Sequence, residues 1–97
     1  MTVYISGKIT GDKNYKAKFR RAEEKILENG DEAVNPAKVT LNKDATWADY
    51  MKYDLHALLV SDAIYMLKGW RFSKGARLER YLAKKLKLKI IYEKKTN

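Results

Sequence analysis

The stretch SDAIYMLKGWRFSKGARLERYLAKKLKLKII, residues 61–91, decides the fold because it places one amphipathic helix between two apolar runs. The run Ser61–Leu67 has the length and composition of a strand buried on both faces. A loop follows over residues 68–72, and Ser73 stands where a helix N-cap is expected. A second apolar strand is expected over Leu88–Tyr92. A strand–helix–strand unit of this length predicts a crossover connection and a parallel pair of strands.

The predicted helix carries a carboxylate on its inward face. Helical spacing places five residues on that face, namely Gly75, Glu79, Leu82, Ala83 and Leu86. Asp54, on the preceding predicted helix, shares the face of Met51 and Leu58 in the same way. A charged group among apolar neighbours is costly unless a partner or a ligand uses it. Glu79 is therefore expected either to pair with a nearby Arg or Lys or to belong to a functional site together with Asp54.

The rest of the chain repeats the alternation of strands and helices. Strands are expected at Thr2–Ser6 and Glu32–Asn35, and helices at Asn14–Asn29 and from Thr46 to about Val60. A polar loop at Ala37–Ala45 is a candidate lid or oligomer contact. This order predicts one α/β domain over residues 1–97, a three-layer sandwich of flavodoxin-like or Rossmann-like type. We expect a parallel sheet of about four strands in the order 2-1-3-4.

A ligand site is expected where strands 1 and 3 of that sheet lie side by side. Ligands of open parallel sheets bind beyond the carboxyl ends of the strands, at the point where the strand order reverses. The loops Ser6–Asp12 and Lys68–Ala76 emerge at that point and face each other. The first loop spaces Gly7 and Gly11 as G-x-x-x-G, which lets backbone N–H groups approach a phosphate. The same spacing also fits a plain strand–helix turn.

Composition narrows the classes of function. The 97 residues include no cysteine and a single histidine, His56, so disulfides and thiolate chemistry are excluded and neither a metal centre nor a cofactor is expected. No segment has the length of a membrane span and the N-terminus lacks a signal pattern, which favours the cytoplasm and no membrane partner. The net charge of +9 favours an anionic partner.

Two partner classes follow from surface residues. A homodimer or larger homo-oligomer is expected because the chain has more aromatic residues than a four-stranded monomer readily buries, namely Trp47, Tyr50, Tyr53, Trp70 and Tyr81. A nucleic-acid partner is the less favoured alternative. It rests on the basic residues near the C-terminus, namely Lys84, Lys85, Lys87, Lys89, Lys94 and Lys95, preceded by Arg71, Lys74, Arg77 and Arg80.

Three segments, YISGKITGD, NPA and DLHALLVSDAIYMLKGWRFSKGARLE, carry a family resemblance. Together they resemble the nucleoside 2-deoxyribosyltransferase-like superfamily, above all its small members of unassigned function with a G-W-x-x-S-x-G-A-x-L-E signature. The resemblance implies that Glu79 is the nucleophile that attacks the anomeric carbon of a nucleoside or nucleotide. It implies that Asp54 is the acid or orienting partner and that Tyr4 hydrogen-bonds Glu79.

The resemblance also implies a substrate-binding set. Ser73 stands where relatives that hydrolyse nucleoside 5′-monophosphates carry a phosphate-contacting serine, and Trp70 is expected to stack on the base. The full set is Ser6, Gly7, Lys8, Gly69, Trp70, Ser73, Gly75 and Ala76. One departure from the family pattern is Arg80-Tyr81 after the glutamate, where a small apolar residue and glycine are usual.

The expected function is therefore that of a nucleoside or nucleoside 5′-monophosphate N-glycosidase or deoxyribosyltransferase. The alternatives are a protein that binds or sequesters a nucleotide without turnover, and a basic nucleic-acid-binding module.

Overall fold

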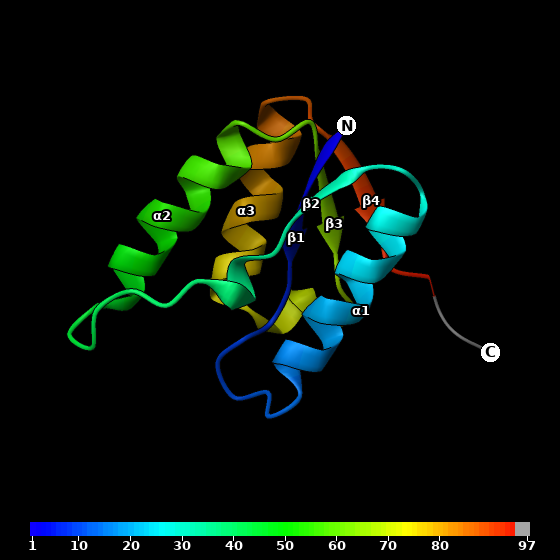
Figure 1. Cartoon of the computed structure of the whole chain (residues 1–97). Coiled ribbons are helices and arrows are strands. Elements are labelled where there is room, and N and C mark those ends of the chain that lie inside the picture. The colour runs from blue at the N-terminus through cyan, green and yellow to red at the C-terminus, as the bar shows by residue number, and fades with distance from the viewer. Residues whose placement is uncertain (95–97) are drawn as a thin grey trace.

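The computed structural model describes residues 1–94 of the chain (Figure 1). The strands are β1 (Thr2–Ser6), β2 (Glu32–Val34), β3 (Ala63–Met66) and β4 (Lys89–Tyr92). The helices are α1 (Tyr15–Glu28), α2 (Trp47–Leu59) and α3 (Lys74–Lys85), with 3₁₀ turns η1 (Pro36–Lys38) and η2 (Trp70–Phe72). Strand and helix therefore alternate along the chain as the sequence predicts.

The four strands form one sheet in the order β2-β1-β3-β4, and all three neighbouring pairs are parallel. The central pair aligns Tyr4 with Ile64 and Ser6 with Met66. All four residues of β3 are buried, as expected for a strand covered on both faces. The predicted fold class and strand order are confirmed: the domain is a flavodoxin-like or Rossmann-like α/β sandwich.

Helices cover both faces of the sheet, with α1 on one side and α2 and α3 on the other (Figure 1). Successive residues of β1 point to opposite faces because a strand has a period of two. The α1 side is packed by Val3, Ile5, Phe19, Ala22, Ile26, Ala63, Tyr65 and Leu67. The opposite side is packed by Tyr4, Leu58, Ile64, Met66, Ala76 and Ala83. The sheet is thus the middle layer of three.

Side-chain caps fix the starts of the two helices beside the site. Thr46 and Asp49 form a reciprocal capping box at the start of α2, and the Ser73 hydroxyl accepts a hydrogen bond at the start of α3. The prediction that Leu86 faces inward is wrong, because α3 ends at Lys85 and Leu86 is 51% exposed. The loop at 37–45 begins with the turn η1 and is otherwise irregular.

The described surface exposes several aromatic side chains. Trp47, Tyr53 and Tyr81 are exposed, whereas Tyr50 and Trp70 are half-buried. Self-association through them stays a prediction. Within residues 1–94, no helix combines the length and the apolar character that crossing a membrane requires.

The two phenylalanines test the packing directly. Phe19 is buried in the α1-side core, and Phe72 is 78% exposed. We expect Phe19→Ala to lower the free energy of unfolding by about 3–5 kcal/mol through lost burial and a cavity. Phe72→Ala, the matched control, is expected to change it by about 0.5 kcal/mol or less. Urea denaturation of both variants measures the difference, and equal losses would contradict the core assignment.

Candidate active site

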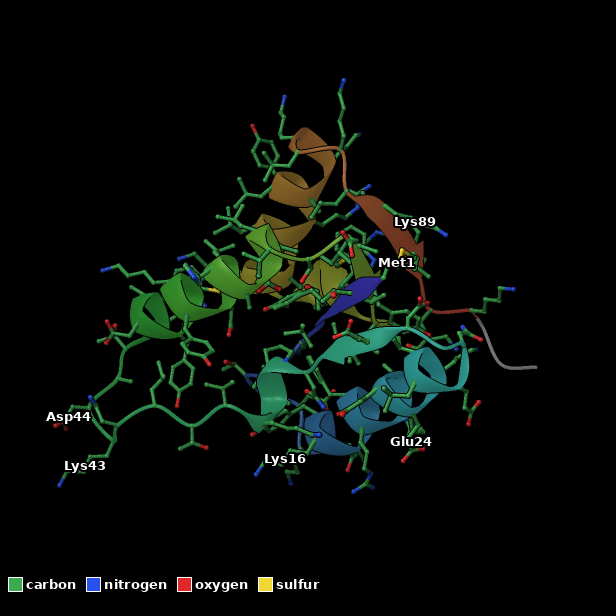
Figure 2. All side chains as sticks on the ribbon, turned by 45° about the horizontal axis from the view of Figure 1, so that its top comes forward. Met1, Lys16, Glu24, Lys43, Asp44 and Lys89 are labelled. Atoms are coloured by element: carbon green, nitrogen blue, oxygen red, sulfur yellow. The ribbon has the colours of Figure 1, made fainter. Side chains whose placement is uncertain are left out.

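A cavity of about 920 Å³ opens beyond the carboxyl ends of β1 and β3. Its walls come from the loop after β1, from α1 and α2, and from the start of α3. The size lies in the range of small-molecule sites, and the location is the one expected for open parallel sheets. The loop between η1 and α2 contributes Val39 and Thr40 to the wall. Its outer part extends away from the sheet, with Lys43 and Asp44 at the tip (Figure 2).

The Glu79 carboxylate lies on the wall of this cavity and is only 5% exposed. The Tyr4 hydroxyl donates a hydrogen bond to Oε2 at 2.6 Å. The Ser6 hydroxyl donates to Oε1, also at 2.6 Å. The expected contact between Tyr4 and Glu79 is therefore present. The alternative that an Arg or Lys neutralises Glu79 is wrong, because none of the ion pairs within residues 1–94 involves it.

The strand β1 provides both hydroxyls because Tyr4 and Ser6 are two residues apart and share one face. Both side chains are buried. Glu79 lies in the second turn of α3, which packs across that face, so each carboxylate oxygen meets one hydroxyl. Short O–H···O⁻ bonds of this kind are stronger than neutral hydrogen bonds. They hold the carboxylate in one orientation.

Burial raises the pKa of Glu79 to about 7, and the negative charge of Asp54 acts in the same direction. The hydrogen bonds from Ser6 and Tyr4 oppose the increase because they favour the ionised form. Burial and the neighbouring carboxylates also raise the pKa of the Tyr4 hydroxyl far above its ordinary value. Tyr4 therefore remains a hydrogen-bond donor at neutral pH.

Asp54 is the second carboxyl group on the cavity wall. It belongs to α2, is 9% exposed, and its Oδ1 is buried without a hydrogen-bond partner among the described residues. Burial raises its pKa to about 6. A buried polar atom without a partner costs about 1–3 kcal/mol, so this position is unfavourable until something binds to Oδ1. The site thus presents two carboxyls whose pKa values lie near neutrality.

Three lysines contribute positive charge to the wall of the same cavity. Lys8, Lys16 and Lys74 all contribute to the cavity wall. The Lys74 Nζ lies 4.4 Å from the centroid of the Trp47 ring, which also lines the cavity. No group of three or more metal-ligating side chains occurs in the part of the chain that the structure describes. The charges suit an anionic ligand.

The start of α3 differs from the predicted phosphate cradle at one position. Ser73 and Gly75 line the cavity, as expected. The Ala76 N–H, however, donates to the Ser73 Oγ at 3.1 Å, so this donor already has a partner, and Ala76 itself is buried. The prediction that Ala76 belongs to the substrate-binding set is therefore not supported. Ser73 caps the helix and retains its own O–H as a donor.

Packing explains the glycines of the cavity wall. A Cβ atom on Gly7 would lie 2.7 Å from Leu67 Cδ1, and one on Gly75 would lie 3.0 Å from Met51 Sδ. Gly75 therefore lets α2 and α3 approach closely beside the site. Gly69 does not line the cavity. It has a φ of 85°, which favours glycine, and it precedes the turn η2.

Three predicted ligand contacts, Ser6, Gly69 and Trp70, are not supported by the structure. Ser6 is not part of the cavity wall, because its hydroxyl is directed to Glu79 in the interior. Neither Trp70 nor Gly69 lines the cavity. The Trp70 ring lies outside the cavity wall, 6.3 Å from that of Tyr92 and 4.8 Å from the Arg80 guanidinium, so stacking of a base on it is not supported.

Other aromatic residues occupy the wall instead, namely Tyr15, Phe19, Trp47, Tyr50 and Phe72. On sequence grounds, Trp47 is expected on a surface for self-association, and Phe72 has no individual role. The signal that was available is the position of Phe72 directly before the helix N-cap, where a side chain reaches the mouth of a site at the helix start. Phe72 is 78% exposed, so it offers an open aromatic face.

Fold and site together define a parallel α/β domain with a cavity whose wall carries two buried carboxyl groups, Asp54 and Glu79. The chain belongs to the family described as a domain of unknown function, DUF4406, which it matches over residues 1–92. No curated protein matches the chain.

The raised pKa of Glu79 predicts a specific pH dependence of stability. The folded state binds this proton more tightly than the unfolded chain, whose carboxyl has its ordinary pKa of 4.5. The stabilisation of the folded state that comes from the raised pKa of Glu79 is therefore fully present below pH 4.5 and is lost as the pH rises through about 7. The loss amounts to about 3 kcal/mol.

We expect Glu79→Gln to gain about this much stability relative to wild type between pH 5 and pH 8. Urea denaturation at the two pH values measures the change. Glu24→Gln, on the exposed side of α1, is the control and should show no such gain (Figure 2). A difference between Glu79→Gln and wild type that is the same at both pH values would show that the Glu79 pKa is not raised.

Proposed function

We propose that the protein binds a nucleoside 5′-monophosphate and cleaves its N-glycosidic bond through Glu79. The observation that carries the proposal is the Glu79 carboxyl itself, buried on the wall of a ligand-sized cavity and held at both oxygens by hydroxyls rather than by a cation. The resemblance of the segment GWRFSKGARLE to the nucleoside 2-deoxyribosyltransferase-like superfamily supports the same assignment.

In the first step, the ionised Glu79 carboxylate attacks the anomeric carbon of the sugar. A new C–O bond forms, and the C–N bond breaks with its electron pair leaving on the base. The base takes a proton from Asp54. Positive charge builds on the sugar carbon in the transition state, where the adjacent carboxylate stabilises it. None of the ion pairs within residues 1–94 involves Glu79, so no paired cation neutralises the nucleophile. The two hydroxyl donors orient the carboxylate and leave it charged.

In the second step, water attacks the glycosyl ester of Glu79 and Asp54 accepts the proton. Hydrolysis frees the sugar phosphate and restores both carboxyl groups. A second base in place of water gives transfer instead of hydrolysis. The mechanism requires an ionised Glu79 and a protonated Asp54. The pKa of Asp54, about 6, lies below that of Glu79, about 7, so the single proton that the pair holds between these pH values resides mainly on Glu79. The reactive arrangement is therefore the minor one-proton form, and its population is greatest between about pH 6 and about 7.

The positive charge around the cavity supports a phosphorylated substrate. Lys8, Lys16 and Lys74 line the cavity, and Ser73 keeps a free O–H at the start of α3. A helix N-terminus favours an anion. Trp47 and Phe72 supply the aromatic surface for the base in place of Trp70.

The proposal predicts release of free base. Wild type is incubated with a panel of nucleosides and their 5′-monophosphates, and free base is measured by chromatography. Glu79→Gln is expected to release base at least about 100-fold more slowly while its ligand affinity changes little, because the nucleophile acts mainly in the transition state. Glu24→Gln should behave like wild type.

Ser73→Ala separates binding from chemistry in the same assay. It should weaken binding of the monophosphate more than binding of the free nucleoside, because only the former has the phosphate that Ser73 contacts. Base release by Glu79→Gln at the wild-type rate would rule out the mechanism. Binding by wild type with no release of any base would replace it with a nucleotide-binding or sequestering function.

A further inference from the structure

The net positive charge of the chain arises from its last third. Residues 68–97 contain eleven Lys or Arg and two Asp or Glu, which accounts for the whole net charge of +9. Residues 1–67 contain ten of each and are neutral. Among the described residues of this segment, Lys74 is the one cation on the wall of the cavity. Five others lie elsewhere on α3 and β4, namely Arg77, Arg80, Lys84, Lys85 and Lys89.

This excess is not neutralised within the described chain. The ion pairs within residues 1–94 use the N-terminal amine, Lys18 and Lys38, all outside the basic segment. The segment has two acidic residues, and one of them, Glu79, is buried on the inner face of α3. Glu93 accepts a hydrogen bond from the Lys68 N–H at 2.8 Å. The cations of α3 and β4 thus face solvent without local counter-charges.

We define the α3–β4 surface by five residues, namely Arg80, Tyr81, Lys84, Lys85 and Tyr92. Arg80, Tyr81, Lys84 and Lys85 line a second hollow on α3. The strand β4 follows α3 and lies at the end of the strand order. Tyr92 is on the α3 side of β4, where it contacts Arg80, whereas Lys89 is on the α1 side because it pairs with Ala63.

Aromatic rings alternate with the cations of this surface. Tyr81 is 56% exposed and Tyr92 is 46% exposed. The Arg80 guanidinium lies 5.9 Å from the Tyr92 ring centroid, and its Nε donates to the Tyr92 hydroxyl at 2.8 Å. The Lys85 Nζ lies 5.6 Å from the Tyr81 ring centroid. Both exposed rings are therefore adjacent to a positive group.

We propose that the α3–β4 surface binds single-stranded nucleic acid, with its lysines and Arg80 on the phosphates and the Tyr81 and Tyr92 rings stacked on bases. Cations alone attract any polyanion, and counterion release makes that binding dependent on salt. Exposed rings beside the cations add a contact that only unpaired bases accept. This combination distinguishes single strands from duplexes and from anionic membranes. The inference uses neither Glu79 nor the cavity.

Fluorescence anisotropy with a labelled oligothymidylate of about 20 nucleotides tests the proposal, beside a duplex of the same length and vesicles containing phosphatidylserine. We expect the single strand to bind more tightly than either at equal salt. The variant Arg80→Gln/Lys84→Gln/Lys85→Gln should bind at least about tenfold more weakly, with the slope of log K against log salt reduced by about 2.

The matched control removes three exposed lysines from the neutral part of the chain, Lys13→Gln/Lys25→Gln/Lys43→Gln, and so has the same net charge. It should lose less than about threefold, since it leaves the phosphate contacts intact. Tyr81→Ala should weaken binding by about five- to 100-fold, whereas Tyr53→Ala, an exposed tyrosine of α2, should not. Glu79→Gln should bind the oligonucleotide like wild type.

Three results would overturn the proposal. Equal losses in the two triple variants would mean that net charge alone drives binding. Equal affinity for duplex and single strand, with no effect of Tyr81→Ala, would remove the stacking contact. Binding to the vesicles but not to the oligonucleotide would assign the surface to a membrane.

Discussion

A carboxyl group can be buried without a cation only if hydrogen bonds replace part of its hydration. The Glu79 carboxyl meets this condition through the Tyr4 and Ser6 hydroxyls, each 2.6 Å from one of its oxygens. The bonds join α3 to the central strand β1, across 75 and 73 residues of sequence. The position of α3 on the sheet, and with it the cavity at the helix start, depends on this arrangement.

The remaining parts of the site follow from the same geometry. Since α3 crosses β1 with Glu79 in its second turn, its capped N-terminus is located beyond the strand ends, where Ser73 and Gly75 reach the cavity. Gly75 brings α2 close, and α2 carries Asp54 to the same wall. Burial raises the pKa of both carboxyls and lowers the stability of the fold at neutral pH. Strongly shifted pKa values of this kind cluster at functional sites.

The fold could be predicted from the sequence because each element has a clear local signal. The sequence shows two apolar runs, at β3 and β4, with a helix capped by Ser73 between them. This pattern alone predicts a crossover connection between two parallel strands. The inward position of Glu79 followed from helical spacing, and its contact with Tyr4 from family resemblance. The bond from Ser6 was missed because it depends on the alignment of α3 with the strand, which is a tertiary property.

The error on Trp70 has a similar cause. The direction of a loop side chain depends on backbone dihedrals, and the positive φ of Gly69 starts a 3₁₀ turn that directs Trp70 to Arg80 and Tyr92 rather than to the cavity. Leu86 was misassigned because periodicity alone does not fix the last residue of a helix. The basic segment was visible in the sequence, but its pairing with exposed tyrosines required the structure.

The most direct test of the account is the titration of the Glu79 carboxyl carbon by ¹³C NMR, with the resonance assigned by its absence in Glu79→Gln. The account predicts a pKa of about 7, and a lower value in Asp54→Asn because that substitution removes a neighbouring negative charge. A Glu79 pKa at its ordinary value of 4.5, unchanged by Asp54→Asn, would contradict the buried, uncompensated carboxyl on which the proposed chemistry rests.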